Sequence, residues 1–210
     1  MLPIYVTYDS GLNIFEQVAV NESMQEFKRL FPNRQIVNYG SRAWSTGDYS
    51  SADWYIANAR RIKTGEYEQL DAYSLNRLMF IEPWQESNPH IDILVTSKDL
   101  SIEGLNFCFG LTNGRTTVQS VFRYRDLIPY ERKAVIKTLI WHELGHVLGA
   151  ALDLNRSNTE NKLGAHCTNH GCVMRQGMDK KEFVLNAIEA DAANRIYCPQ
   201  CMADIRNSRI

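Results

Sequence analysis

The stretch IWHELGHVLGAALD, residues 140–153, contains the pattern His-Glu-x-x-His at His142, Glu143 and His146. On a helix, side chains four positions apart lie on the same face, so both imidazoles can bind one zinc ion. The carboxylate of Glu143 lies beside them, where it can take a proton from a water molecule bound to the metal. A catalytic zinc site has three protein ligands and one open position, so a third ligand must come from elsewhere in the chain.

The residues before this motif have the pattern of an amphipathic helix. After a charged start, apolar residues recur near the helical period at Ala134, Val135, Leu139 and Ile140. Pro129 suits the first turn of a helix. We therefore predict a helix that carries the motif near its C-terminal end.

Composition and charge exclude several classes of protein. The chain has 210 residues, 44% of them hydrophobic, and its 23 basic and 24 acidic side chains leave a net charge of −1. This balance argues against a nucleic-acid partner, and no apolar run reaches the length of a membrane span. The N-terminal residues lack the basic and apolar regions of a secretory signal. We expect a cytoplasmic protein, monomeric rather than oligomeric, with no membrane partner.

Strands and helices alternate along the first half of the chain. Alternating or apolar runs predict strands, and helical spacing predicts helices. The predicted strands are residues 4–8, 35–39, 91–96, 106–111 and 116–124, and the predicted helices are 14–31, 52–61, 66–81, 130–147 and 180–196, with Gly65 between the second and third. Asn113-Gly114 predicts a hairpin between the last two strands. This order indicates an α/β (α+β) fold, a mixed sheet with an antiparallel edge strand and packed helices.

Four of the five cysteines follow the motif helix. Cys108 stands alone in an apolar segment and is expected to be a buried core thiol. In a reducing cytosol, the downstream cysteines are more often metal ligands or redox groups than disulfide partners. They form two pairs, which suit a closed zinc site with no open position: Cys167, Cys172, Cys198 and Cys201.

Three residues are candidates for the third ligand of the two-histidine motif. They are His166, His170 four residues later, and Glu189 in the last predicted helix. Histidine and glutamate both complete such sites, so ligand chemistry alone leaves the choice open. The fifth histidine, His90, precedes a predicted strand and is expected to be structural or exposed.

The order of these motifs resembles a known family. The sequence His142-Glu143-Leu144-Gly145-His146-Val147-Leu148-Gly149 is followed by His166-Cys167-x4-Cys172-x-Met174 and then by Cys198-x-x-Cys201. This series is similar to that of the archaemetzincins, zinc peptidases of the metzincin clan. The segments Val95-Thr96-x-x-Asp99-Leu100 and Gly104-Leu105-Asn106-Phe107 resemble them too, and the resemblance covers residues 91–201.

The resemblance implies a fold, a site and an activity. It makes His142, His146 and His166 the ligands of a catalytic zinc, Glu143 the general base and Met174 the methionine beneath the site. The four downstream cysteines would bind a second, structural zinc. The fold would be a metzincin-like twisted sheet, in which a peptide or protein substrate lies against the strand at residues 106–111. A single metallopeptidase domain, residues 1–210, would comprise subdomains 1–149, with the sheet and the active-site helix, and 150–210, with the third ligand and the cysteines.

The chain departs from the family pattern, H-E-x-x-H-x-x-G-x-x-H, by an insertion. Residues 150–165 separate Gly149 from His166, and residues 175–197 also form a longer link than the family has. The helix either ends at Gly149 or continues through residues 150–154, in which case Gly164 makes the turn back to His166. The Asn-rich residues 155–161 are expected near the cleft, where they would favour short peptides or chain ends.

Two other functions remain open from the residues alone. One is a gluzincin-like peptidase, in which Glu189 is the third zinc ligand. The other is a zinc-stabilised peptide-binding module with little or no catalysis. The presence of Glu143 argues against the second, because a purely structural site has no need of a base at that position.

Overall fold

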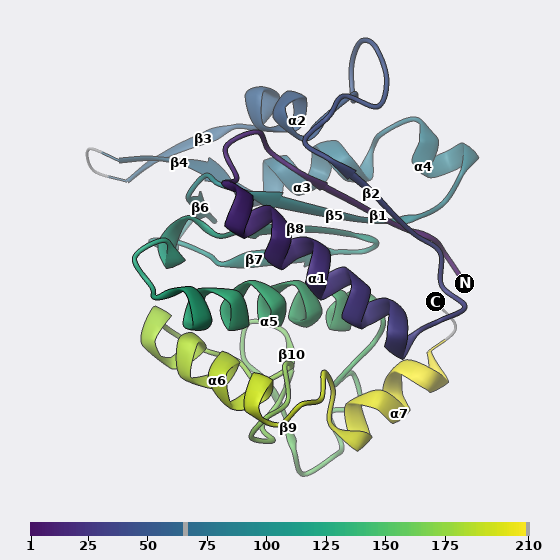
Figure 1. Cartoon of the computed structure of the whole chain (residues 1–210), viewed down its shortest axis with the longest axis vertical. Coiled ribbons are helices and arrows are strands. Elements are labelled where there is room, and N and C mark those ends of the chain that lie inside the picture. The colour runs from purple at the N-terminus through teal and green to yellow at the C-terminus, as the bar shows by residue number, and fades with distance from the viewer. Residues whose placement is uncertain (65–66, 209–210) are drawn as a thin grey trace. The chain divides into compact units, whose positions relative to one another are not determined.

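The computed structural model describes residues 1–64 and 67–208 (Figure 1). The chain consists of two compact units, Met1–Arg123 and Tyr124–Ile210. The motif helix belongs to the second unit, whereas we expected it in a subdomain ending at residue 149; the single domain 1–210 stays a prediction. No helix within the described residues is long and apolar enough to cross a membrane. The predicted cytoplasmic location is not tested by this finding.

A five-stranded mixed sheet forms the centre of the first unit, in the order β2-β1-β5-β8-β7. Its strands are β1 (Ile4–Tyr8), β2 (Ile36–Gly40), β5 (Ile91–Thr96), β7 (Gly110–Asn113) and β8 (Thr116–Ser120). β1, β2, β5 and β8 are parallel to one another, while β7 pairs antiparallel with β8. All six residues of β5 are buried, as expected for a strand inside a parallel sheet. The predicted mixed sheet with an antiparallel edge strand is therefore confirmed.

The three longer helices of the first unit, among the described residues, begin at side-chain caps. The helices are α1 (Ile14–Leu30), α2 (Ala52–Asn58), α3 (Ala72–Phe80) and the short α4 (Trp84–Ser87). Asn13 and Glu16 form a reciprocal capping box at the start of α1. Ser51 and Asp71 cap α2 and α3 through their side chains. The core packs α2 and α3 against β-strands through residues such as Tyr55, Leu75 and Leu94.

Our prediction of long helices at residues 52–61 and 66–81 is wrong at residues 59–61 and 67–71. Here the chain forms β3 (Arg61–Thr64) and β4 (Tyr67–Asp71), which pair with each other and, through β4, with β6 (Leu100–Ser101). The Asp71 carboxylate accepts a hydrogen bond from the Tyr73 backbone and forms an ion pair with Arg60. Helix α3 therefore starts after Asp71. Gly65 and Glu66 lie outside the described residues.

The hairpin predicted at Asn113-Gly114 is confirmed, but its strands are shifted along the chain. Strand β7 begins at Gly110 rather than at residue 106. Strand β8 ends at Ser120, whose Oγ accepts from the Phe122 backbone 3.2 Å away and starts the 3-10 turn η1 (Phe122–Tyr124). Cys108 is buried, as predicted.

The described residues of the second unit form three α-helices and a small hairpin. They are α5 (Pro129–Val147), α6 (Lys180–Ala192), α7 (Pro199–Asn207) and the antiparallel strands β9 (Thr159–Asn161) and β10 (Ala165–Cys167). Helices α5 and α6 pack against each other, and Lys137 of α5 contacts the Asp191 carboxylate of α6 at 3.0 Å. The last helix was predicted to reach residue 196, but it ends at Ala192, and α7 was not predicted.

Candidate metal centres

Helix α5 brings the motif residues together and ends just before Gly149. His142 and Glu143 are buried, and the Nε2 atoms of His142 and His146 lie 3.1 Å apart. Gly149 has a φ of +81°, and its N–H donates to His146 while that of Ala150 donates to Gly145. These two bonds form a Schellman motif, which ends a helix. The alternative that residues 150–154 continue the helix is therefore wrong.

Strand β10 places His166 against the other two histidines. Ligand nitrogens of His142, His146 and His166 all lie within 4.8 Å of one another. The ring centroid of His166 is 5.1 Å from that of His142 and 4.9 Å from that of His146. Zinc–nitrogen bonds of about 2.0–2.1 Å place the nitrogens of a tetrahedral site roughly 3.3 Å apart. The 3.1 Å between the helix histidines fits this arrangement.

The three histidines are held as neutral rings with one nitrogen free for a metal. Burial and the nearby His166 lower the pKa of His142 to about 3, and burial also lowers the pKa values of His146 and His166. The Nδ1 of His142 lies 2.7 Å from the Val173 carbonyl, and that of His166 lies 3.0 Å from the Gly164 carbonyl. Such bonds to Nδ1–H fix the tautomer in which Nε2 carries the lone pair.

The other two candidates for the third ligand lie together at the surface. Glu189 accepts a hydrogen bond from Arg175 at 2.9 Å and lies 3.0 Å from Nδ1 of His170, and its side chain is 45% exposed. Neither Glu189 nor His170 joins the cluster of His142, His146 and His166 in the described residues. Of the three candidates, the structure brings only His166 to the motif.

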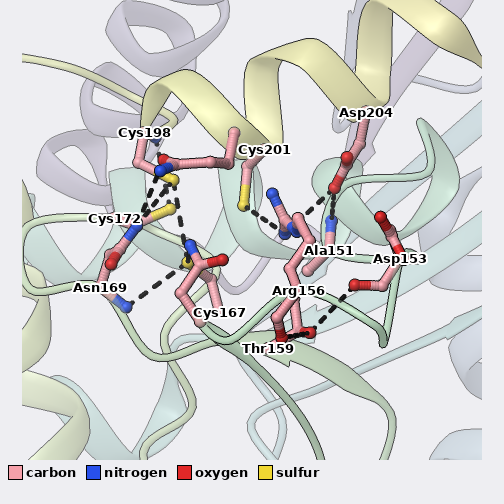
Figure 2. Close-up of polar contacts among 12 residues, drawn as sticks. Ala151, Asp153, Arg156, Thr159, Cys167, Asn169, Cys172, Cys198, Cys201 and Asp204 are labelled. Carbon is pink, nitrogen blue, oxygen red and sulfur yellow. Dashed lines mark hydrogen bonds and ion pairs between the residues drawn. The ribbon is translucent and has the colours of Figure 1, made fainter.

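Four cysteines form a second, closed cluster (Figure 2). Cys167 ends β10, Cys172 lies in the following loop, Cys198 caps α7 and Cys201 lies in its first turn. None of these buried sulfurs, each within the described residues, forms a disulfide. The Cys167 and Cys198 sulfurs are 3.8 Å apart, and zinc–sulfur bonds of about 2.3 Å predict roughly 3.8 Å in a tetrahedral site. The donor set therefore fits zinc.

Backbone and side-chain N–H groups surround the sulfurs. The Asn169 backbone donates to Cys167 at 3.5 Å, its side chain donates to Cys198 at 3.4 Å, and the Cys198 backbone donates to Cys172 at 3.4 Å. Contact with Cys167, Cys198 and Cys201 raises the pKa of the Cys172 thiol, so four ionised sulfurs at these distances need a cation.

The insertion after Gly149 packs on this cysteine cluster, which the sequence reasoning did not foresee. Arg156 donates to the Cys201 sulfur at 3.7 Å and pairs with Asp204 of α7 at 3.1 Å (Figure 2). Asn158 donates to the Cys167 sulfur at 3.7 Å. No motif predicts such contacts, because they depend on how a loop folds back onto a helix later in the chain.

Met174 lies beneath the motif helix, buried against its glycine. An added Cβ at Gly145 would stand 2.2 Å from the Met174 sulfur and 3.0 Å from the Tyr197 ring. Tyr197 also donates a hydrogen bond of 2.7 Å to the Trp141 carbonyl of α5. A glycine is required here because the methionine and the tyrosine occupy the space of a side chain.

Comparison with known proteins finds archaemetzincins among the curated relatives. No family model matches the chain. A curated archaemetzincin of Archaeoglobus fulgidus is 34% identical over 116 residues, which are 53% of this chain and 58% of that protein. The matched part thus spans little more than half the length of that relative.

Solved structures share the fold over nearly the whole chain. The crystal structure of archaemetzincin from Methanopyrus kandleri matches with a TM-score of 0.66 and 18% identity, covering 98% of this chain and 94% of that one. A structure described as a zinc-dependent peptidase from Methanocorpusculum labreanum matches with a TM-score of 0.59 and 17% identity, over 96% and 99% of the two chains. In the matched part of its sequence and in its fold, this chain is similar to the archaemetzincins.

Proposed function

We propose that this protein is a zinc-dependent peptidase. The observation that carries the proposal is the cluster of three neutral histidines, His142, His146 and His166, with the buried Glu143 adjacent in sequence to the first of them. Three ligands leave a tetrahedral ion with one open position, as catalytic zinc sites have. The relative from Methanocorpusculum labreanum, described as a zinc-dependent peptidase, supports the same activity.

The zinc and the side chains around it have separate roles in peptide hydrolysis. Zinc held by the histidines would act as a Lewis acid, polarising the peptide carbonyl and lowering the pKa of a water molecule. Glu143 accepts the proton of the attacking water and returns it to the leaving amine. The Val173 and Gly164 carbonyls hold His142 and His166 in the orientation that presents Nε2.

We assign a second, structural zinc to the four cysteines. Its four thiolates leave no open position, so it stabilises the fold and takes no part in hydrolysis. The substrate is a peptide or protein. The preference for short peptides or chain ends stays a prediction that rests on the insertion at residues 150–165.

The test of the enzymatic proposal is Glu143→Gln. This change keeps the shape of the side chain but removes the base, so the rate of peptide hydrolysis should fall by about 10²–10⁴-fold. Zinc content, measured by mass spectrometry of the metal, should stay at the wild-type value. Unchanged hydrolysis by the zinc-loaded variant would overturn the role of Glu143 as general base, whereas no hydrolysis by zinc-loaded wild type would favour a peptide-binding module.

The choice of third ligand is tested by two matched alanine variants. His166→Ala should lose the catalytic zinc and all hydrolysis, because it removes one of three ligands. Glu189→Ala should keep both, because Glu189 is paired with Arg175 and His170 at the surface. Loss of zinc in Glu189→Ala alone would instead support the gluzincin-like arrangement.

A further inference from the structure

A third group of metal-binding side chains lies in the first unit, far along the chain from the motif. Ligand atoms of Glu82, His90 and Asp92 lie within 4.8 Å of one another, and all three residues are buried. Glu82 lies between α3 and α4, His90 precedes β5, and Asp92 is in β5. His90, expected from the sequence to be structural or exposed, is fully buried.

Each of the three side chains is held by a neighbour. The Nδ1 of His90 lies 2.6 Å from the Asn88 carbonyl. Gln85 donates to Oδ2 of Asp92 at 2.6 Å, and the Tyr55 hydroxyl donates to Oε2 of Glu82. These contacts fix the orientation of the side chains and leave Nε2 of His90 and Oε1 of Glu82 to face each other.

The facing atoms are close but do not satisfy one another. His90 Nε2 is 2.8 Å from Glu82 Oε1 and 3.1 Å from Asp92 Oδ2. Nevertheless, His90 Nε2 and Glu82 Oε1 are buried without any hydrogen bond of acceptable geometry. Metal bonds of about 2.0–2.2 Å place neighbouring ligand atoms roughly 3 Å apart. A shared cation explains both the spacing and the missing hydrogen bonds.

His90 is oriented in the same way as two of the motif histidines. In His142 and His166 as in His90, Nδ1 lies against a backbone carbonyl, at 2.7, 3.0 and 2.6 Å. In each case this contact makes Nε2 the nitrogen that faces the other side chains of the cluster. Histidine with two carboxylates is a donor set that suits zinc, manganese or iron(II).

Charge also favours a cation at this point. Burial raises the pKa values of the Glu82 and Asp92 carboxyls, which shows the cost of two negative charges in one dry place. A cavity of about 270 Å³, lined by aromatic residues such as Tyr5, Tyr39 and Trp44, borders the three side chains. The cavity gives a bound ion room for water or a further ligand beside its three protein ligands.

We infer that Glu82, His90 and Asp92 bind one divalent transition-metal ion at the base of this aromatic cavity. The site is independent of the proposed peptidase site, because all its ligands come from the first unit. The competing explanation is a protonated His90 between the two carboxylates. In that case the cluster would be an internal ion group and would take up no metal.

The experiment counts metal ions in the full chain. Wild type, Glu82→Gln and Asp92→Asn are dialysed against zinc, and the bound ions are counted by mass spectrometry. Each variant should hold one ion fewer than wild type, whatever number the second unit binds, with affinity at this site weaker by at least about 100-fold. Hydrolysis by the proposed peptidase is measured in parallel, so failure of one proposal is separate from failure of the other.

The matched control is Glu189→Gln, an exposed carboxylate that also contacts a histidine. It should keep the wild-type count. Equal counts in wild type and both folded variants would overturn the inference. If the variants fail to fold, the zinc-loaded wild type is dialysed against buffer without free zinc and titrated with Mn²⁺ under electron paramagnetic resonance. The mass-spectrometric count gives the fraction of the site that still holds zinc, and only the remaining fraction is expected to take up Mn²⁺. Uptake of Mn²⁺ by oxygen and nitrogen ligands in that fraction supports the site, and no uptake overturns it.

Discussion

The two donor clusters of the second unit differ in what surrounds them. The histidine cluster has three neutral donors, a neighbouring carboxylate at Glu143, and a member, His146, that is not fully buried. The cysteine cluster has four buried sulfurs enclosed by N–H donors. The first arrangement leaves an open position, while the second is closed, so the difference separates a site suited to chemistry from one suited to stability.

The closed cluster also positions parts of the open one, because neighbouring residues serve both. On β10, successive side chains point to opposite faces, so His166 joins the histidines while Cys167 joins the sulfurs. Next to Cys172, the Val173 carbonyl contacts His142. Next to Cys198, Tyr197 donates to the carbonyl of Trp141 in α5. Three links therefore run from the cysteine cluster to the motif helix and its histidines.

The largest effect should follow from breaking the closed cluster with Cys198→Ser. Loss of one thiolate should release the structural zinc and lower the free energy of unfolding of the second unit by more than about 4 kcal/mol. Zinc at the histidines should be lost too, because the links to His166 and His142 would loosen. Thermal unfolding and metal counting measure both effects.

Cys108→Ser is the matched control for that variant. Cys108 is a buried cysteine of the first unit that belongs to neither cluster of the second. Its substitution should leave the zinc count of the second unit unchanged. If Cys198→Ser kept full zinc at the histidines and full hydrolysis, the two clusters would be independent, and the cysteine cluster would not position the histidines.

A smaller effect is expected from Gly145→Ala, which places a methyl group against Met174 and Tyr197 between the two clusters. The new Cβ would meet the Met174 sulfur at 2.2 Å, and Met174 is fully buried and cannot move aside freely. Overpacking of this kind costs about 1–3 kcal/mol. Chemical denaturation should show this loss, and hydrolysis should fall because His142 and His146 lie on the same helix.

A double-mutant cycle with Met174→Ala checks the cause of that loss. If Met174 is the obstacle, Gly145→Ala should cost less in the Met174→Ala background than in wild type. Equal costs in the two backgrounds would show that helix geometry, and not Met174, demands the glycine.

The sequence predicted those parts of the molecule that local spacing determines. The motif helix, the hairpin at Asn113-Gly114 and the central strand at residues 91–96 follow from patterns a few residues long. The helices predicted at residues 52–61 and 66–81 extend too far towards each other, because the apolar periodicity continues through Asp71, whose side chain caps α3. In the sequence, the periodicity over many residues is a stronger signal than the single capping residue.

The candidate sites divide in the same way. His142, His146 and the cysteine pairs stand out because their spacing matches a ligand geometry. The choice among His166, His170 and Glu189 needed the turn at Gly164, where φ is +120°. Arg156 and the cluster of Glu82, His90 and Asp92 have no local signal at all, since tertiary packing alone brings them to their partners.

The smallest effect should come from Tyr197→Phe, which cuts one link and leaves both clusters in place. The change removes only the hydroxyl that donates to the Trp141 carbonyl at 2.7 Å, so the free energy of unfolding should fall by about 0.5–1.5 kcal/mol. Zinc counts should stay at the wild-type value, because no ligand is touched. Tyr130→Phe, an exposed tyrosine of the same unit, is the control and should be neutral. If Tyr197→Phe were equally neutral, the connection between the clusters would rest on His166–Cys167 and Cys172–Val173 alone, where the backbone rather than a side chain provides the link.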